Sequence, residues 1–226
     1  MNEIQTGAPA QNNEKLELAD HLLYIAIKYR NALIGALVLI VCTGGGVFFW
    51  IQNQQNREQE AALQLSRVAP YFDHKEFGIA INGQGKMSGL KKIADDYAGT
   101  SSGNMASLMI ANAYYLNGNI DSALKAFKSV SIDSRDLAAA ALAGAGACYF
   151  EKKQFTEAAS AFDDASKKAE TTALKSLYLA KEANCFRQAN QLAKAAELDR
   201  KIIADYPLSQ GAAIAQQTLW QISGNL

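Results

Sequence analysis

One residue pattern recurs three times in the second half of this chain, and it limits the available folds more than any other feature. Residues 112–130 align with residues 147–165 at an offset of 35 residues, and a third copy follows 37 residues later. In each copy small and aromatic residues precede a turn, and an alanine (Ala123, Ala158 or Ala195) follows it. A helix pair this short cannot bury its apolar face alone, so it needs stacked neighbours. The pattern therefore predicts an all-α solenoid of antiparallel helix pairs.

The first copy shows how each pair is built. Apolar residues at helical spacing run from residue 104 to a turn at residues 117–119. The turn reads Asn-Gly-Asn, and these residue types tolerate conformations through which a helix cannot continue. A second helix is expected to begin near Asp121. A generic alanine-rich helical bundle is the alternative interpretation.

The period and the order of residue types resemble the tetratricopeptide repeat, a helix-pair repeat of about 34 residues. The first two copies fit this pattern well. The third copy is weaker, because Asp199 stands where the first two copies have the aromatic residues Phe127 and Phe162.

Residues 32–51 form a run of 20 residues without a charge. At about 1.5 Å per residue, a helix of this length spans the roughly 30 Å hydrocarbon core of a bilayer. Eleven of these residues are Leu, Ile, Val or Phe, which together favour insertion by about 3–7 kcal/mol. We therefore expect one N-terminal transmembrane helix, in which Gly44, Gly45 and Gly46 let another membrane helix pack closely.

Three alternatives to a membrane span fit this run less well. A core helix of a soluble protein normally shows polar residues on one side, and this run shows none. A cleaved signal peptide has a shorter preceding segment, a shorter apolar run and a small-residue cleavage site after it. A lipid anchor on Cys42 is disfavoured by the bulky Val41 before it.

The charges that flank the run predict its orientation. Lys28 and Arg30 precede it directly, whereas Arg57 and Arg67 follow it in the company of acidic residues. The positive-inside bias places the N-terminus in the cytoplasm, and Trp50 is positioned as an interfacial anchor. The repeats would then lie outside the cytoplasm.

These observations divide the chain into four parts. They are a cytoplasmic tail with an amphipathic helix (1–31), the transmembrane helix (32–51), a stalk with a glycine-containing loop (52–89), and the repeat domain with a C-terminal capping helix (90–226). The membrane helix is expected to continue as a stalk to Pro70, and residues 77–81 are expected to form a short extended piece. Residues 90–97 are expected to form a short helix, and residues 211–222 the capping helix.

The composition and motifs of the chain give no sign of catalysis, metal binding or nucleic-acid binding. The chain has 22 basic and 22 acidic residues, a balance that gives no field for nucleic acid. No nucleophile elbow, phosphate-binding loop, zinc spacing or carboxylate pair is present, so we predict no catalytic residue, metal, cofactor or small-molecule substrate. His21 and His74 are interpreted as surface residues, and Cys148 and Cys185 as free packing thiols.

A stack of helix pairs presents a concave surface lined by the first helix of each pair. The residues expected to form a protein-binding groove there are Leu108, Asn112, Tyr115, Ala143, Ala147, Phe150, Ala180, Asn184 and Arg187. The two asparagines occupy the same repeat position, where their amides either hydrogen-bond a peptide backbone or are ordinary polar groups. With Arg187 as the one cation, no carboxylate clamp is expected in this groove. The groove suits a hydrophobic helix or segment.

The order of charged tail, single span, stalk and repeats, with the sequence from IADDYAGTSSG to SALKAF, resembles the YfgM-like family of single-span tetratricopeptide proteins. Members of that family are ancillary subunits of the SecYEG translocon. The resemblance implies an inner-membrane protein with periplasmic repeats. Its partners would be translocon subunits, periplasmic chaperones or nascent polypeptides. The alternative is a structural subunit of another cell-envelope assembly, such as a biogenesis or motility complex.

Overall fold

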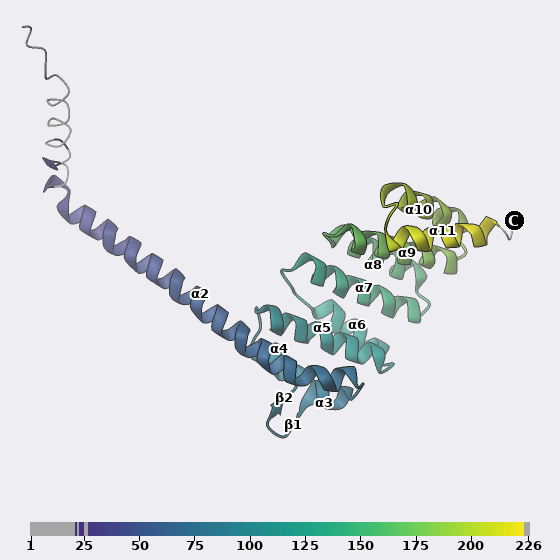
Figure 1. Ribbon diagram of the computed structural model, residues 1–226, viewed down its shortest axis with the longest axis horizontal. Coiled ribbons are helices and arrows are strands. Elements are labelled where there is room, and N and C mark those ends of the chain that lie inside the picture. Colours follow the sequence, from purple (N-terminus) through teal and green to yellow (C-terminus); the bar gives the residue numbers. More distant parts are fainter. Residues whose placement is uncertain (1–20, 22, 25–26, 224–226) are drawn as a thin grey trace, which may run out of the picture. The chain divides into compact units, whose positions relative to one another are not determined.

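The computed structural model describes residues 21, 23–24 and 27–223, and it divides into two compact units that meet between Gln55 and Asn56. Most of the expected tail, with its amphipathic helix, lies outside the described residues. The described helices are α2 (Arg30–Asp73), α3 (Phe77–Asn82), α4 (Leu90–Asp96), α5 (Ser101–Leu116), α6 (Ile120–Ser129), α7 (Arg135–Glu151), α8 (Phe155–Lys168), α9 (Thr172–Gln188), α10 (Leu192–Asp205) and α11 (Gln210–Ser223). The described strands, β1 (Gly83–Gln84) and β2 (Met87–Ser88), are only two residues long each. The rest of the regular structure is helical, so the prediction of an all-α fold is confirmed (Figure 1).

The first unit contains the N-terminal part of α2. Every side chain from Ile34 to Ile51 is exposed in the structure, although this segment is strongly apolar. The helix is long and apolar enough to cross a membrane by length and composition. Apolar side chains exposed on all sides of a helix are typical of a helix that faces lipid.

The C-terminal part of α2 belongs to the second unit and differs from the expected stalk. The helix passes Pro70 and ends at Asp73. Ala61 and Val68 have no exposed surface, and they pack in one apolar cluster with Leu90 and Ile93 of α4. This part of α2 is therefore the first packed helix of the second unit.

Two neighbouring charges on α2 bond the end of α4 and the start of α5. The Glu58 carboxylate accepts a hydrogen bond of 3.1 Å from the Ser102 backbone N–H and one of 2.6 Å from its hydroxyl. The Arg57 guanidinium donates to the carbonyl of Asp96 at 3.0 Å. An acid at the start of α5 and a base at the end of α4 satisfy helix-end groups and suit the helix dipoles.

The segment expected as an extended piece is the helix α3. Phe77, Ala80 and Ile81 are buried, and their i, i+3, i+4 spacing is helical rather than alternating. The Phe77 ring also packs edge to face on Phe72, with 5.6 Å between ring centroids. The glycine-containing loop after α3 forms the antiparallel β1–β2 hairpin.

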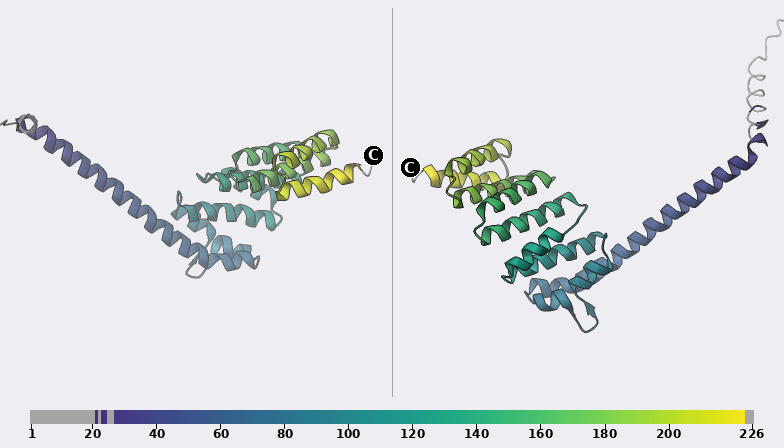
Figure 2. Two further views of the ribbon diagram at one scale, coloured as in Figure 1. Left: turned by 45° about the horizontal axis from the view of Figure 1, so that its top comes forward. Right: turned by 180° about the vertical axis from the view of Figure 1, so that it is seen from behind.

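The remaining helices stack in chain order, as Figures 1 and 2 show for α5 to α11. The pairs are α5–α6, α7–α8 and α9–α10, and each pair also contacts the next one. Helix α11 packs on α9 and α10, where Ala212 and Ala215 join Ile202 in an apolar cluster. The prediction of stacked helix pairs is confirmed, and the segment expected as a terminal capping helix, residues 211–222, lies within α11.

The three pairs share one turn geometry. Gly118, Lys153 and Asn190 follow the first helix of their pairs, and they have positive φ angles of 78°, 60° and 58°. In each turn the N–H of the next residue donates to a carbonyl five residues earlier, as Asn119 does to Tyr114 at 2.9 Å. This hydrogen bond is characteristic of the Schellman motif, a helix ending that usually contains glycine. It satisfies a backbone carbonyl that has no partner within the helix. The repeat therefore fixes the backbone of the turn even where the residue is not glycine.

Small residues set the distance between helices. Ala123, Ala158 and Ala195 have no exposed surface. A Cβ atom added at Gly144 of α7 would overlap the Phe127 ring of α6. The aromatic side chain thus fills a gap that only glycine leaves open at that position, as the repeat pattern predicts for close helix approach.

Replacing Lys153 with glycine is expected to raise the free energy of unfolding by about 0.5–1 kcal/mol, because glycine carries no Cβ strain at positive φ. Denaturant unfolding of the full chain in a mild detergent, followed by circular dichroism, measures this change. The matched control is Lys125→Gly in the middle of α6, which should lose about 1 kcal/mol. A loss of stability in Lys153→Gly would contradict the proposed role of the turn.

Candidate protein-binding surface on the first helices of the pairs

The nine predicted groove residues lie at three equivalent positions on α5, α7 and α9. The first position is not on an open surface. Leu108, Ala143 and Ala180 are only 6%, 8% and 3% exposed, and each packs in an apolar cluster between helices. Their spacing in the sequence predicts a place in the groove, but the stacking of neighbouring pairs covers this side of the helix.

The second position is half-buried in all three pairs, at Asn112, Ala147 and Asn184. The Asn184 side-chain oxygen accepts a hydrogen bond from the Arg187 guanidinium at 3.1 Å, so this amide is partly engaged within the chain. Within the described residues, no side-chain hydrogen bond of this kind is found for Asn112. Of the two recurring asparagines, Asn112 is the one whose amide is better placed to bond a partner.

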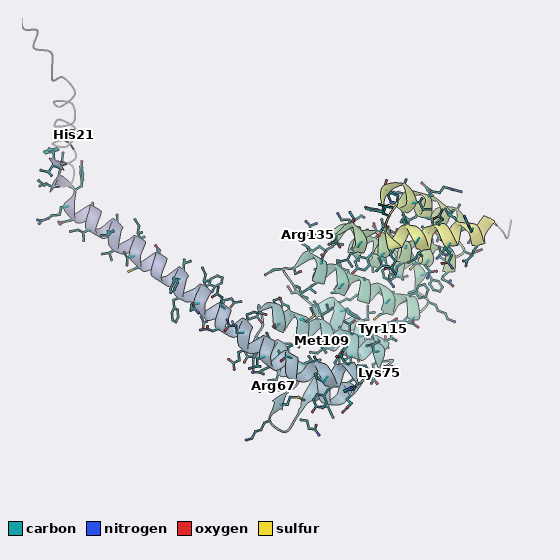
Figure 3. All side chains as sticks on the ribbon, viewed as in Figure 1. His21, Arg67, Lys75, Met109, Tyr115 and Arg135 are labelled. Atoms are coloured by element: carbon teal, nitrogen blue, oxygen red, sulfur yellow. The ribbon has the colours of Figure 1, made fainter. Side chains whose placement is uncertain are left out.

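The third position combines two aromatic rings and a cation. The Tyr115 hydroxyl donates a long hydrogen bond of 3.4 Å to Glu151 of α7, and Figure 3 labels this tyrosine on α5. The Phe150 ring packs edge to face on Phe155, at 5.3 Å between centroids. Both rings are half-buried, so each keeps part of its surface available. Their role in binding a partner stays a prediction.

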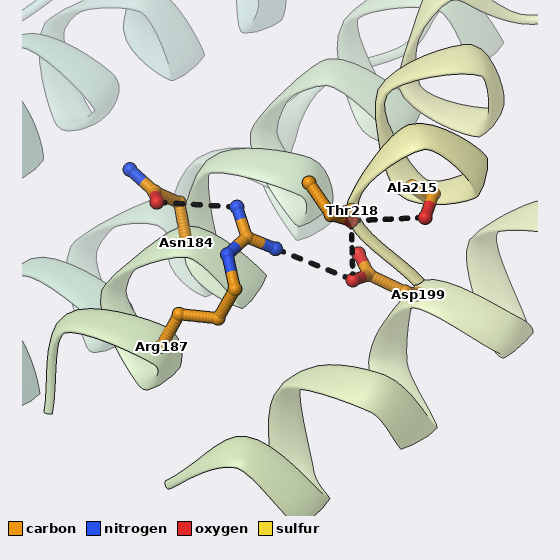
Figure 4. Close-up of polar contacts among 5 residues, drawn as sticks. All are labelled: Asn184, Arg187, Asp199, Ala215 and Thr218. Carbon is orange, nitrogen blue, oxygen red and sulfur yellow. Dashed lines mark hydrogen bonds and ion pairs between the residues drawn. The ribbon is translucent and has the colours of Figure 1, made fainter. Parts of the chain in front are cut away.

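Arg187 does not serve as a free cation. Its guanidinium forms an ion pair of 3.3 Å with Asp199 of α10, and its side chain is only 18% exposed. Figure 4 shows this contact together with the 2.7 Å hydrogen bond that the Thr218 hydroxyl of α11 donates to the same Asp199 oxygen. Burial raises the pKa of Asp199, while Thr218 and Arg187 oppose that shift. The network joins α9, α10 and α11.

Asp199 occupies the position of the missing third aromatic, and it is fully buried. Its second oxygen, Oδ1, has no hydrogen-bond partner among the described groups. The irregularity that weakened the third copy in the sequence is therefore a polar junction between the last pair and the terminal helix. Nothing in the sequence pattern identified Thr218 as its partner.

Sequence reasoning also missed a cavity of about 370 Å³ at the connection between α6 and α7. Apolar residues of the connection, Val130 and Ile132, line it with Phe127 and a row of small residues on α7. Its volume lies at the lower end of the range of ligand pockets. The sequence does contain a signal for this cavity. The connection has two apolar residues, and four consecutive alanines follow at 138–141, where larger side chains would fill the space.

The described residues contain no group of three or more His, Cys, Asp or Glu side chains arranged to hold a metal ion. Cys148 and Cys185 are free and buried, as predicted. Burial raises the pKa of Cys148 to about 11 and that of Cys185 to about 12. Both stay protonated thiols at neutral pH and pack as small apolar groups.

One further titratable group lies between helices. Glu182 of α9 is half-buried. Burial, followed by the nearby Asp163 carboxylate, raises its pKa to about 7, against the opposing effects of Lys167 and Lys201. The side chain therefore changes charge near neutral pH.

Removing the Arg187 side chain is expected to lower the free energy of unfolding by about 1–3 kcal/mol, because the Asp199 charge would stay buried with Thr218 as its remaining partner. Arg135→Ala is the matched control, since its ion pair with Glu170 is solvent-exposed and should contribute less than about 0.5 kcal/mol. Denaturant unfolding measures both variants. Equal losses would contradict the structural role of the buried pair.

Glu182 also predicts a dependence of stability on pH. Its pKa is about 7 in the folded chain against 4.5 ordinarily, so its stabilising contribution is complete below about pH 4.5 and is lost as the pH rises through 7. After a discount for partial solvent exposure, we expect the unfolding free energy to fall by about 1–2 kcal/mol between pH 5 and 8. This decline should be absent in Glu182→Gln and retained in Glu197→Gln, an exposed glutamate on α10. A decline retained in Glu182→Gln would exclude this residue as its source.

Residues 27–146 match the model of a protein family described as the tetratricopeptide repeat-like domain. Neither a curated protein nor a solved structure matches the chain. The matched region includes the apolar segment, the packed part of α2 and the α5–α6 pair, and it covers more than half of the 226 residues. The helix pairs, their shared turn and this match agree, and the chain belongs to the tetratricopeptide repeat-like domain family.

Proposed function

We propose that this protein is a membrane-anchored adaptor that binds other polypeptides through the first helices of its repeats. Helix-pair repeats of this class generally act as protein-binding scaffolds, and the described residues offer no metal cluster. The observation that carries the proposal is the combination, in one chain, of an apolar helix exposed on all sides with a stack of helix pairs.

The ends of the apolar helix support the anchor. On its N-terminal side, the Lys28 ammonium lies over the rings of Tyr24 and Tyr29, at 5.4 and 5.6 Å from their centroids. Trp50 is exposed at the other end. Aromatic residues at both ends of an apolar helix, with cations at one of them, are typical of a span whose charged end stays in the cytoplasm. The proposed location is the inner membrane, with the repeats in the periplasm.

The surface available for a partner follows from the burial of the predicted groove. With Leu108, Ala143 and Ala180 in the core and Arg187 paired, the remaining contacts are the half-buried Tyr115, Phe150, Asn112 and the alanine at 147. This set is mildly apolar with one amide that can bond a backbone. It suits a hydrophobic segment of an exported chain or of a chaperone better than an acidic ligand.

The partner proposed from the resemblance to the YfgM-like family is the Sec translocon, together with periplasmic chaperones or emerging polypeptides. The balanced charge of the chain, with 22 basic and 22 acidic residues, argues against nucleic acid as a ligand.

A photoreactive amino acid placed at position 115 or 150 in living cells is expected to crosslink to the same polypeptides, whereas one at the exposed Lys125 of α6 should not. Mass spectrometry of the products, and of a tagged full-length copy purified in detergent, should identify translocon subunits. Equal crosslinking from position 125 would contradict a binding surface on the first helices. Capture of a different envelope assembly without translocon subunits would contradict the proposed partner.

A further inference from the structure

The cavity of about 370 Å³ at the connection between α6 and α7 has no role in the proposed function. Phe127, Val130 and Ile132 line one of its walls, and small residues of α7 line the other. Tyr115 and Phe150 stand just before the turns that join α5 to α6 and α7 to α8. These turns lie at the opposite end of the antiparallel helices, so the cavity is separate from the proposed binding surface.

The next interface of the stack shows which side chains this space lacks. Helix α9 repeats α7 at an offset of 37 residues, the offset that aligns their buried cysteines. In this register Tyr178 and Glu182 of α9 stand where α7 has Ala141 and Ala145. Two long side chains of α9 therefore correspond to two methyl groups of α7. In a close-packed stack, such a replacement leaves a gap beside the helix.

Tyr178 occupies the equivalent space at the interface between α8 and α9. It is only 6% exposed and packs in one apolar cluster with Phe162, Ala165 and Ala169. Phe127 is the counterpart of Phe162 35 residues earlier, and it lines the cavity. Both interfaces thus have the aromatic wall, and the second also has the Tyr178 ring. An apolar cavity of about 150 Å³ is enough to hold a benzene ring, so the larger cavity beside Phe127 admits an aromatic side chain.

The backbone of the connection between α6 and α7 supplies a second observation. Val130 and Ser134 at its two ends have extended conformations, with ψ angles of 119° and 118°. Within the described part of the chain, the backbone N–H groups of residues 131–133 donate to no other backbone group. In the connection between α8 and α9, by contrast, the Glu170 N–H donates to the Asp136 carboxylate at 2.7 Å. Main-chain donors beside a side-chain pocket are the features that recognise an extended peptide.

We infer that this cavity receives the aromatic side chain of a tyrosine or phenylalanine in an extended segment of a partner polypeptide. The ring would enter beside Phe127 and against the alanines of α7, in the place that Tyr178 has at the next interface. The backbone carbonyls of the segment would accept hydrogen bonds from residues 131–133. Lys128 and Ser131 are exposed at the rim, so the ring reaches the cavity from solvent. The assignment to a polypeptide rests on the proposed adaptor function, whereas the site for a ring does not.

The test follows the methyl NMR resonances of Val130, Ile132 and Leu142, which line the cavity. The full-length protein in detergent is labelled at its methyl groups and titrated with the peptide N-acetyl-Gly-Tyr-Gly amide. The three resonances should shift, while that of Ile202, in the apolar cluster of the last helices, should stay in place. The same peptide with alanine instead of tyrosine should produce no shift.

Filling the cavity from within the chain should block the site. Ala141→Tyr gives α7 the ring that α9 carries, so it should raise the denaturant midpoint of unfolding and weaken peptide binding at least about tenfold. Lys125→Tyr on the exposed face of α6 is the matched control and should leave peptide binding unchanged. Val130→Phe fills the same space from the connection, and it decides the question if Ala141→Tyr does not fold. Circular dichroism verifies folding in each case.

Other outcomes overturn the assignment. Unchanged peptide binding in a folded Ala141→Tyr or Val130→Phe variant would exclude the cavity as the site. Equal shifts with the alanine peptide would show that no side-chain pocket is used. Shifts with p-cresol but not with the tyrosine peptide would assign the cavity to a small aromatic molecule, and no shift with either would exclude an aromatic site. Crosslinking from positions 115 and 150 tests the adaptor function at the other end of the helices, so each result can fail without the other.

Discussion

Close approach of helices at small residues is the constraint on which the repeat unit depends. The fully buried alanines at 123, 158 and 195 let the two helices of a pair meet, and the aromatic side chains at 127 and 162 fill the space beside them. Close packing of this kind leaves little tolerance for a change in volume. The same close stacking buries Leu108, Ala143 and Ala180, the innermost residues of the predicted groove.

Polar groups complete the unit where apolar packing ends. At its start, Arg57 and Glu58 of α2 bond the adjoining ends of α4 and α5. At its far end, Asp199 joins α10 to α11 through Thr218 and to α9 through Arg187. Charges that look like surface residues in the sequence thus act as helix-end caps and as an internal junction. The same placement removes Arg187 from the set of free cations.

The fold was largely predictable because its signals are local and repeated. The turn at Gly118, the alanine–aromatic spacing and the uncharged run at 32–51 each depend on residues close in sequence. The errors involve contacts between distant residues. The helical state of residues 77–81 depends on the packing of Phe77 against Phe72, and the burial of Ala61 and Val68 depends on α4. Thr218, the partner of Asp199, lies 19 residues away in the sequence, and no periodic pattern specifies such a pair.

The polar junction at Asp199 makes the two ends of the helix stack unequal. In a linear array, stability is approximately a sum of each repeat's own stability and its interface with the next repeat. The interfaces at Phe127 and Phe162 are apolar, whereas the last one contains a desolvated carboxylate with an unsatisfied oxygen. We therefore expect fraying to start at the C-terminal helix and to proceed inward, so that α11 opens at a lower free energy than the helices at the other end of the stack.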